Sequence, residues 1–200
     1  MRCRLPALLL PLTCCASVSA RTESVNPKLS KTPLCGDQIE IYRSILRSNS
    51  KGLHHPLHLA FVTMPVEQCD LGEACTRAIS LAHGNGREIH RIDSAHVDGL
   101  DVALVDPQLP DKILANRDSG NVWKDTRSKA TKEAYNHAFN QAFPTGLYWL
   151  SEVLFDESCQ RALVTHGFVC NLLCGQSETV LFQKSAEQWQ RADRYSLRIF

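Results

Sequence analysis

The sequence predicts an α+β fold in which helices pack on a mostly antiparallel sheet and disulfides brace the chain. Three observations support this. Four runs rich in Val, Leu, Phe, Trp and Tyr follow one another from residue 146 to the end, separated only by short polar segments. Antiparallel strands tolerate such short connections, whereas parallel strands need a crossover of about a dozen residues. Two earlier segments carry apolar residues at helical spacing, and the chain contains nine cysteines.

The composition is that of one ordinary globular domain. The 200 residues are 44% hydrophobic and 22% charged, with a formal charge of +1. Nucleic-acid binding is disfavoured because phosphate-tracking surfaces need clustered Lys and Arg. The basic residues of the C-terminal tail, Arg191, Arg194 and Arg198, are diluted by Asp193. Electrostatic binding to a membrane surface is disfavoured for the same reason.

The first twenty residues predict a secretory signal peptide, 1–20. Arg2 and Arg4 precede an apolar, uncharged run, and small residues end it at Ala20. The run is too short to cross a bilayer, which takes roughly 20 apolar residues. We therefore expect cleavage after Ala20, a secreted or periplasmic protein, and no transmembrane span in the mature chain.

A lipoprotein acylated at Cys14 or Cys15 is the alternative, although the residues before each cysteine fit a lipobox poorly. Cleavage after Ala20 removes two arginines and so lowers the formal charge from +1 to −1. It also removes Cys3, Cys14 and Cys15 and leaves six cysteines. An even number in an oxidising compartment predicts disulfides.

Six cysteines allow 15 pairings, and sequence alone does not choose among them. Short loops favour two local bridges and leave the third by elimination. The expected pairs are Cys69 with Cys75, Cys170 with Cys174, and Cys35 with Cys159.

The N-terminal part of the mature chain predicts an extended lead-in over 21–36, followed by a single domain over 37–200. Apolar residues at helical spacing predict a helix over 37–48, with Asp37 as its cap. A strand is expected over 57–63, between two prolines.

The middle of the chain is less regular. A short helix is expected over 72–83, and two strands over 87–93 and 101–106 around a turn near Asp98-Gly99. Residues 107–126 are polar and predict a surface excursion or a loop shaped by a partner. The strongest helical pattern covers 128–143, where Ala and aromatic residues recur every three to four positions.

The C-terminal part predicts a four-strand antiparallel meander. The four strand-type runs cover 146–155, 160–169, 178–184 and 188–200. The connections between them are too short for parallel crossovers.

One segment of this meander resembles a group of uncharacterised secreted bacterial proteins. In that group, a strand ending in Phe-Asp turns into Ala-Leu-Val and an aromatic strand, then Cys-x3-Cys-Gly, then a strand like "VLFEK" and a turn into Trp. The matching residues here are Phe155, Asp156, Ala162, Leu163, Val164, Phe168, Cys170, Cys174, Gly175, Val180, Leu181, Lys184 and Trp189. Cys159 and the ending "YSLRIF" depart from the pattern. The resemblance implies a fold element and an exported location, and no catalytic residue.

Cys170 and Cys174 admit three interpretations. A zinc site needs about four ligands, and no second Cys or His motif of that kind accompanies them. A redox pair is normally Cys-x-x-Cys at a helix N-terminus, whereas here three residues separate the cysteines and strands flank them. We therefore expect a structural disulfide that pins a hairpin corner.

Other possible sites have weaker support. His54, His55 and His58, with His83, His90 or His96, form a conceivable metal site, but exposed loop histidines explain them better. Neither Ser119 nor Ser177 lies in a Gly-x-Ser-x-Gly elbow. The acid pairs Asp98 with Asp101 and Glu152 with Asp156 are typical of solvated turns. The aromatics Phe139, Phe143, Tyr148 and Trp149 predict a helix packed on the meander, or a groove where helix and sheet meet.

The functional hypothesis is a non-catalytic binding or envelope-associated module, with an unknown protein or small-molecule partner and no cofactor. The alternative is a secreted hydrolase whose site lies in the concavity of the sheet near His166. A pocket that holds His166 with a carboxylate nearby would favour the enzyme, and a filled sheet face would oppose it.

Overall fold

The structure is a computed structural model that describes residues 28–64, 82–83, 88–117, 129–171 and 174–199. The predicted signal peptide, the bridge between Cys69 and Cys75, and most of the helix expected at 72–83 lie outside the described residues.

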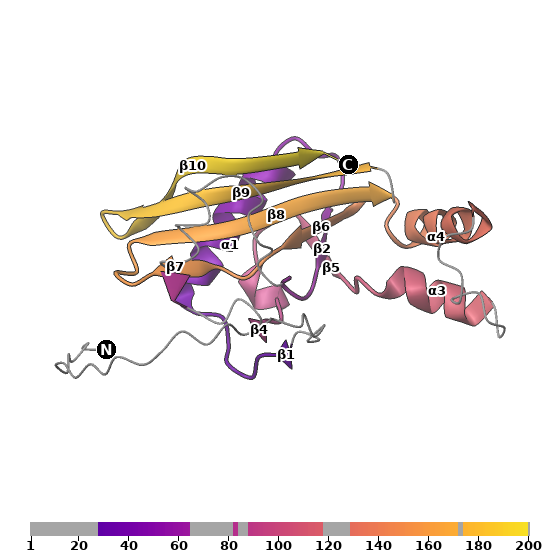
Figure 1. The fold of residues 1–200 in the computed structure, drawn as a ribbon, viewed down its shortest axis with the longest axis horizontal. Coiled ribbons are helices and arrows are strands. Elements are labelled where there is room, and N and C mark those ends of the chain that lie inside the picture. The colour runs from indigo at the N-terminus through magenta and orange to yellow at the C-terminus, as the bar shows by residue number, and fades with distance from the viewer. Residues whose placement is uncertain (1–27, 65–81, 84–87, 118–128, 172–173, 200) are drawn as a thin grey trace, which may run out of the picture.

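Three long antiparallel strands form the main part of the sheet: β8 (Arg161–Asn171), β9 (Cys174–Ser185) and β10 (Gln188–Ile199). The short strand β6 (Leu147–Leu150) pairs with the other side of β8, so the strand order is β10-β9-β8-β6. Figure 1 shows these strands in orange and yellow, running the length of the body. The α+β class and the C-terminal meander are therefore confirmed.

The first expected strand of the meander, 146–155, is two strands and not one. After β6 the chain breaks and resumes as β7 (Leu154–Asp156), which pairs with a more distant part of β8. At the break, Ser151 Oγ accepts a hydrogen bond from the backbone N–H of Thr165 (2.8 Å), and the Glu152 N–H donates to the Met64 carbonyl (2.8 Å). These bonds replace the regular ladder and turn Glu152 toward the strand-like segment around Met64.

The sheet continues beyond β6 with two parallel strands. β2 (Leu57–Ala60) lies between β6 and β5 (Val102–Val105) and is parallel to both. Their sequences, LHLA and VALV, are mainly apolar; β2 is largely buried, whereas the residues of β5 are half-buried. The strand expected at 57–63 is therefore present but shorter.

The two strands expected at 87–93 and 101–106 are present only in part and do not pair around a turn. β4 (Glu88–Ile89) pairs in parallel with β1 (Lys28–Leu29), whereas β5 pairs with β2. A one-turn 3-10 helix, η1 (Ser94–His96), lies between β4 and β5. Residues 82–83, expected to end a helix, form strand β3 (Ala82–His83) against β7.

The two best-patterned helices are confirmed: α1 (Gly36–Ser50) and α4 (Lys129–Ala142). The surface excursion expected from residue 107 contains a helix that the sequence did not predict, α3 (Leu109–Arg117). Asp106 Oδ1 accepts the Gln108 backbone N–H at the start of this helix, and Pro110 occupies its first turn. α3 and α4 lie side by side at one end of the molecule (Figure 1).

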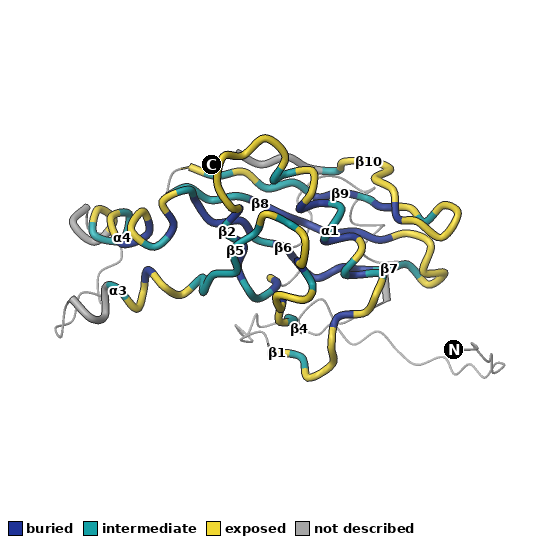
Figure 2. Tube along the Cα trace, turned by 180° about the vertical axis from the view of Figure 1, so that it is seen from behind, coloured by how far each residue is buried: buried dark blue, intermediate teal, exposed yellow. Residues whose placement is uncertain are grey.

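Helices cover both faces of the sheet. A cluster of buried apolar residues lies between α1 and one face, and a second cluster lies between α4 and the other face. α1 lies behind the long strands in Figure 1 and buries Ile41, Tyr42, Ile45 and Leu46 against one face. Phe139 and Phe143 of α4 pack on the opposite face near one end. Figure 2 shows the buried stretches running through α1, β8 and β9. We call the two sides the α1 face and the α4 face.

The described part of the lead-in is held by backbone pairing and by one buried side chain. β1 binds β4, Ser30 N–H donates to the Ile89 carbonyl (2.7 Å), and Leu34 is buried in the core. At the other end of the sheet order, β10 is an edge strand, and its pairing with β9 shifts register near Arg191 and again near Arg194. No helix in the described part of the chain is long and apolar enough to cross a membrane.

Candidate functional site

A cleft opens on the α1 face, where α1 ends while the strands beneath it continue. The 15-residue helix spans about 22 Å, whereas the 12 residues of β9 span about 40 Å. The N-terminal turn of α1 lies over the C-terminal end of β9, where Lys184 Nζ is 3.0 Å from Asp37 Oδ1. Part of the α1 face is therefore left uncovered beyond Asn49.

The cleft has two parts that share Asn49, Tyr148, Phe168 and Gln176 as lining residues. The outer lobe holds about 340 Å³ and has mainly apolar walls from Leu53, Leu57 and Phe168, with His55, His58 and Thr145 at its margin. The inner lobe holds about 150 Å³ and is polar; His166, Glu178 and Arg194 line it. Ligand sites in proteins combine apolar walls with a few converging polar groups in this way.

A chain of polar contacts crosses the inner lobe from β6 to β9. The Tyr148 hydroxyl lies 2.6 Å from His166 Nδ1, and His166 Nε2 lies 3.4 Å from Glu178 Oε2. The Tyr148 and His166 rings are stacked, with centroids 5.7 Å apart. Because His166 and Glu178 occupy directly opposed positions on β8 and β9, sheet register brings them together.

Two residues of this chain, His166 and Tyr148, are neutral near pH 7. Burial lowers the pKa of the His166 imidazole to about 4, although the Glu178 carboxylate opposes the shift. Burial raises the pKa of the Tyr148 phenol well above its ordinary value, and Glu178 raises it further. A carboxylate only accepts hydrogen bonds, so Nε2 of His166 carries the proton and Nδ1 accepts from the Tyr148 hydroxyl.

Two arginines of β10 meet the far side of Glu178. Its Oε1 atom accepts a close hydrogen bond from Arg191 Nη2 and lies 3.3 Å from Arg194 Nη1. Glu178 is only 15% exposed, whereas Arg194 is 55% exposed. Arg194 is one of the residues that line the inner lobe, so its guanidinium borders both Glu178 and the empty space.

Two glycines allow close packing around the cleft: Gly167 against Trp149 on the α4 face behind it, and Gly146 against Phe168 in its wall. A Cβ on Gly167 would stand 2.6 Å from the Trp149 ring, so the indole packs directly on the backbone of β8. Gly146, with a φ of 84°, makes the turn into β6, and the Phe168 ring occupies the space where its side chain would be. Only glycine allows both this backbone and this close approach. Phe168 is thereby held at the junction of the two lobes.

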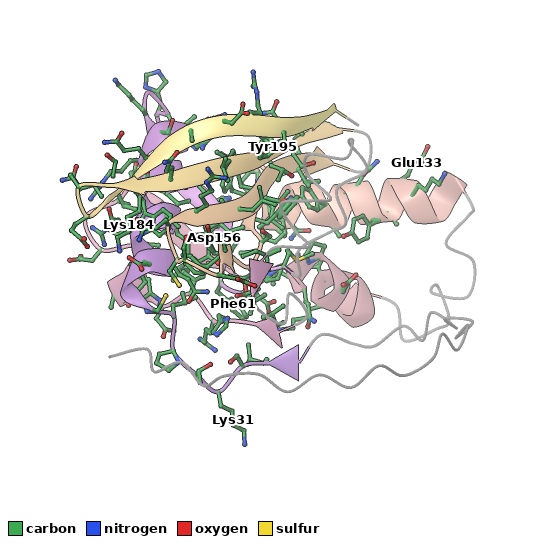
Figure 3. The ribbon with its side chains drawn as sticks, turned by 60° about the vertical axis from the view of Figure 1, so that its left-hand side comes forward. Lys31, Phe61, Glu133, Asp156, Lys184 and Tyr195 are labelled. Carbon is green, nitrogen blue, oxygen red and sulfur yellow. A yellow bond between two sulfur atoms is a disulfide. The ribbon has the colours of Figure 1, made fainter. Side chains whose placement is uncertain are left out.

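The position of α1 over the sheet is fixed at its N-terminus. The Trp189 indole N–H and Lys184 Nζ both donate to Asp37 Oδ1, each at 3.0 Å. The hydrogen bond from Trp189 is the main cause that lowers the pKa of the Asp37 carboxyl. Figure 3 shows Lys184 at the same end of the sheet as Asp156 of the β7–β8 turn. The free end of α1 is therefore the end that borders the cleft.

A second polar cluster lies away from the cleft. The buried Glu152 accepts hydrogen bonds from the Thr63 hydroxyl, the His90 backbone N–H (2.9 Å) and His90 Nδ1 (2.9 Å). His90 Nε2 lies 3.5 Å from Thr32 Oγ1 of the lead-in. The order hydroxyl–imidazole–carboxylate is that of a hydrolase triad. However, Thr32 is exposed, and these residues line neither lobe, so the cluster ties the lead-in to the sheet.

Glu152 and Asp156, one of the two acid pairs considered from the sequence, have separate partners. Glu152 belongs to the His90 cluster, whereas Asp156 Oδ1 accepts the backbone N–H groups of Gln160 (2.9 Å) and Arg161 (3.0 Å) in a hairpin turn. Asp98 offers its backbone carbonyl to Arg43 (2.7 Å).

The expected disulfide between Cys170 and Cys174 is present, and it closes the β8–β9 hairpin. The third expected bridge is wrong: Cys35 and Cys159 are both free and exposed. Cys35 lies at the N-terminal cap of α1, where its backbone N–H donates to the Gln38 side chain (2.9 Å). Cys159 occupies a left-handed turn with a φ of 54°. The Cys35–Cys159 bridge was predicted only because these two cysteines remained after the local pairs, and their places in the fold do not bring them together.

His55 and His58 both lie at the margin of the outer lobe, but the other described histidines do not join them. His58 lies at the margin of the outer lobe with Nδ1 3.1 Å from Thr145 Oγ1, whereas His90 and His96 lie in other parts of the fold. Among the described residues, no group of three or more His, Cys, Asp or Glu side chains is placed to hold a metal ion.

Sequence reasoning singled out His166 but missed Tyr148, Glu178 and Arg194 as its surroundings. One signal was present. In a hairpin closed at Cys170 and Cys174, residues equally distant from the two cysteines face each other, which places His166 opposite Glu178. Of the aromatics, Phe139 and Phe143 are core residues, whereas Tyr148 lines the cleft.

Comparisons with known proteins give no relative for this chain: no family model, no curated protein and no solved structure matches it.

Proposed function

We propose that the protein is a non-catalytic binding module whose ligand is a small molecule held in the cleft on the α1 face. The observation that carries this proposal is the pairing of an apolar outer lobe of about 340 Å³ with a polar inner lobe of about 150 Å³. This combination suits a ligand with an apolar body and one polar end.

The inner lobe holds His166 with the Glu178 carboxylate 3.4 Å away, which is the arrangement expected to favour the hydrolase alternative. The state of His166 nevertheless favours binding over hydrolysis. A general base needs a free nitrogen within reach of a nucleophile. Both nitrogens of His166 already face partners, the Tyr148 hydroxyl and the Glu178 carboxylate. With its pKa near 4, the imidazole is a weak base. Ser177 also lines the inner lobe, but strand alternation directs its side chain away from the face that Glu178 occupies.

The proposal includes export, as the sequence of residues 1–20 suggests. The disulfide between Cys170 and Cys174 supports it because such bonds persist in oxidising compartments.

The cleft can be tested by blocking it. Gln176 is exposed and lines both lobes, so Gln176→Trp should place a large ring in the cleft. Gln183→Trp is the matched control, because Gln183 is an equally exposed glutamine of the same strand that lines neither lobe. The probe is the neutral dye N-phenyl-1-naphthylamine, whose fluorescence rises in apolar sites.

We expect saturable dye binding to the wild type and to Gln183→Trp, and at least tenfold weaker binding to Gln176→Trp. Circular dichroism verifies that both variants are folded. Absence of saturable binding to the wild type, or equal binding to the two variants, would overturn the proposal.

A further inference from the structure

The charges around the inner lobe do not balance. One carboxylate, Glu178, faces two guanidinium groups, Arg191 and Arg194, while His166 and Tyr148 are neutral near pH 7. The cluster therefore carries one excess positive charge next to a cavity.

The excess charge is accessible from the cavity through Arg194. Arg191 makes the closer contact with Glu178, whereas Arg194 is 3.3 Å from the same oxygen and more than half exposed. A guanidinium group has five N–H donors, and Glu178 is the one acidic side chain with which Arg194 forms an ion pair among the described residues. Donors of Arg194 therefore remain for a group that enters the inner lobe.

The neighbouring acid does not cancel this charge inside the cleft. Asp193 is exposed, and its Oδ1 accepts the backbone N–H of Arg194 (2.7 Å). Asp193 pairs with Leu181, whose side chain alternates to the face opposite that of Val180 and Glu178. The Asp193 charge lies in water on the other side of the strand, where solvent screens it.

We infer that the ligand of the cleft is an amphiphilic monoanion, with a carboxylate, sulfonate or similar group on Arg194 and an apolar body in the outer lobe. This inference rests on the proposed function. A single anionic group neutralises the cluster, whereas a second negative charge would lie against the Glu178 carboxylate without a partner. The inner lobe of about 150 Å³ is small and polar and suits a head group of a few atoms.

The remaining contacts are consistent with this orientation. Asn49 and Gln176, at the junction of the lobes, carry amides that donate or accept hydrogen bonds. Leu53, Leu57 and Phe168 face the space where the apolar body would lie.

A pair of dyes tests the charge separately from the cleft. 1-Anilinonaphthalene-8-sulfonate has the same aromatic body as N-phenyl-1-naphthylamine and adds one sulfonate. Dissociation constants of both dyes are measured by fluorescence titration on the wild type and on Arg194→Gln, Arg194→Lys and Arg161→Gln. Arg161 is an exposed arginine of β8 that lines neither lobe, so it controls for the loss of one positive charge.

We expect Arg194→Gln to weaken binding of the sulfonate dye about tenfold and to change binding of the neutral dye less than twofold. Arg194→Lys keeps the charge and should lose no more than threefold, and Arg161→Gln should change neither constant. If Arg194→Gln affects the two dyes equally while Gln176→Trp still blocks the neutral dye, the inference is wrong and the proposed cleft stands. If Gln176→Trp blocks neither dye, the proposed function itself fails.

Discussion

His90 Nδ1 lies 2.9 Å from Glu152 Oε2, and the His90 backbone N–H lies 2.9 Å from the other oxygen of the same carboxylate. Both oxygens of this buried acid are thus occupied by one residue, with the Thr63 hydroxyl as a further donor. The carboxylate joins the break after β6 to the segment that follows β4, two parts of the chain far apart in sequence.

We expect Glu152→Gln to destabilise the fold by about 1–3 kcal/mol, because an amide replaces one acceptor oxygen by a donor and leaves a buried N–H group facing another donor. Urea denaturation followed by circular dichroism measures this. Glu187→Gln is the control, since Glu187 is 94% exposed, and it should stay within about 0.5 kcal/mol of the wild type. Equal stabilities for the two variants would contradict the role given to Glu152.

The His166 imidazole makes stability depend on pH. Its pKa is about 4 in the folded protein against 6.5 for an ordinary histidine. Between these values the unfolded chain binds the proton and the folded chain does not. The stabilisation that depends on a neutral His166 is therefore fully present above pH 6.5, and it falls as the pH decreases toward 4. The slope reaches at most about 1.4 kcal/mol per pH unit.

Unfolding free energies measured at pH 7 and pH 5 should therefore differ more for the wild type than for His166→Gln, which cannot titrate. The difference between the two proteins isolates the histidine from the carboxylates that also titrate in acid. Parallel pH profiles for both would show that burial does not hold His166 neutral.

Gly167→Ala should destabilise the protein by about 1–3 kcal/mol, because the new methyl group would stand 2.6 Å from the Trp149 ring and the sheet must shift to admit it. Thermal unfolding gives the size of the effect, and tryptophan fluorescence should change at the same time. Gly36→Ala is the matched control: it has open space around its Cβ and begins a helix, so its stability should equal or exceed that of the wild type. A neutral Gly167→Ala would mean that Trp149 packs elsewhere.

Alkylation of the unreduced protein should label Cys35 and Cys159 and should leave Cys170 and Cys174 unlabelled. Peptide mass spectrometry identifies the modified residues. Replacing Cys170 and Cys174 by serine should cost about 2 kcal/mol, toward the low end for a disulfide because the closed loop is small. A Cys35→Ser, Cys159→Ser double variant should be close to the wild type. If both Cys35 and Cys159 were protected from alkylation, the bridge between them that elimination suggested from the sequence would be supported instead.

The N-terminus of the exported protein should be Arg21, because small residues at Ala20 and two positions before it fit a signal-peptidase site. N-terminal sequencing of the protein from the periplasm or medium of a bacterial host measures this. Ala20→Gln should slow processing, since a larger side chain fits that site poorly. A mature protein that begins at Cys14 or Cys15 and carries a lipid would establish the lipoprotein alternative.

Local patterns were sufficient to predict α1, α4 and the meander. In each of these segments, the spacing of the apolar residues matches the repeat of a helix or of a strand, so they fall on one face that can be buried. The helix α3 was missed because residues 107–126 offer few apolar anchors, and its start depends on Asp106 and Pro110. The parallel pairing of β2 with β5 was also missed, since a crossover leaves no local mark on either strand.

The candidate site was foreseen in only one residue for a related reason. His166 is conspicuous as a histidine in an apolar strand, but its partners come from three other strands. Tyr148 depends on the pairing of β6 with β8, and Arg194 on bulged pairing at the edge. Glu178 was the one partner that the sequence could have predicted, because the expected Cys170–Cys174 bridge fixes the register that places it opposite His166.

The irregular pairing of β10 has a consequence for how the protein behaves at high concentration. A twelve-residue strand at the end of a sheet presents free backbone groups to which a second chain can add. The shifts near Arg191 and Arg194 interrupt that row, and the charges of the two arginines and Asp193 are set along it. The same irregularity that turns Arg194 toward Glu178 thus also protects the molecule from edge-to-edge aggregation.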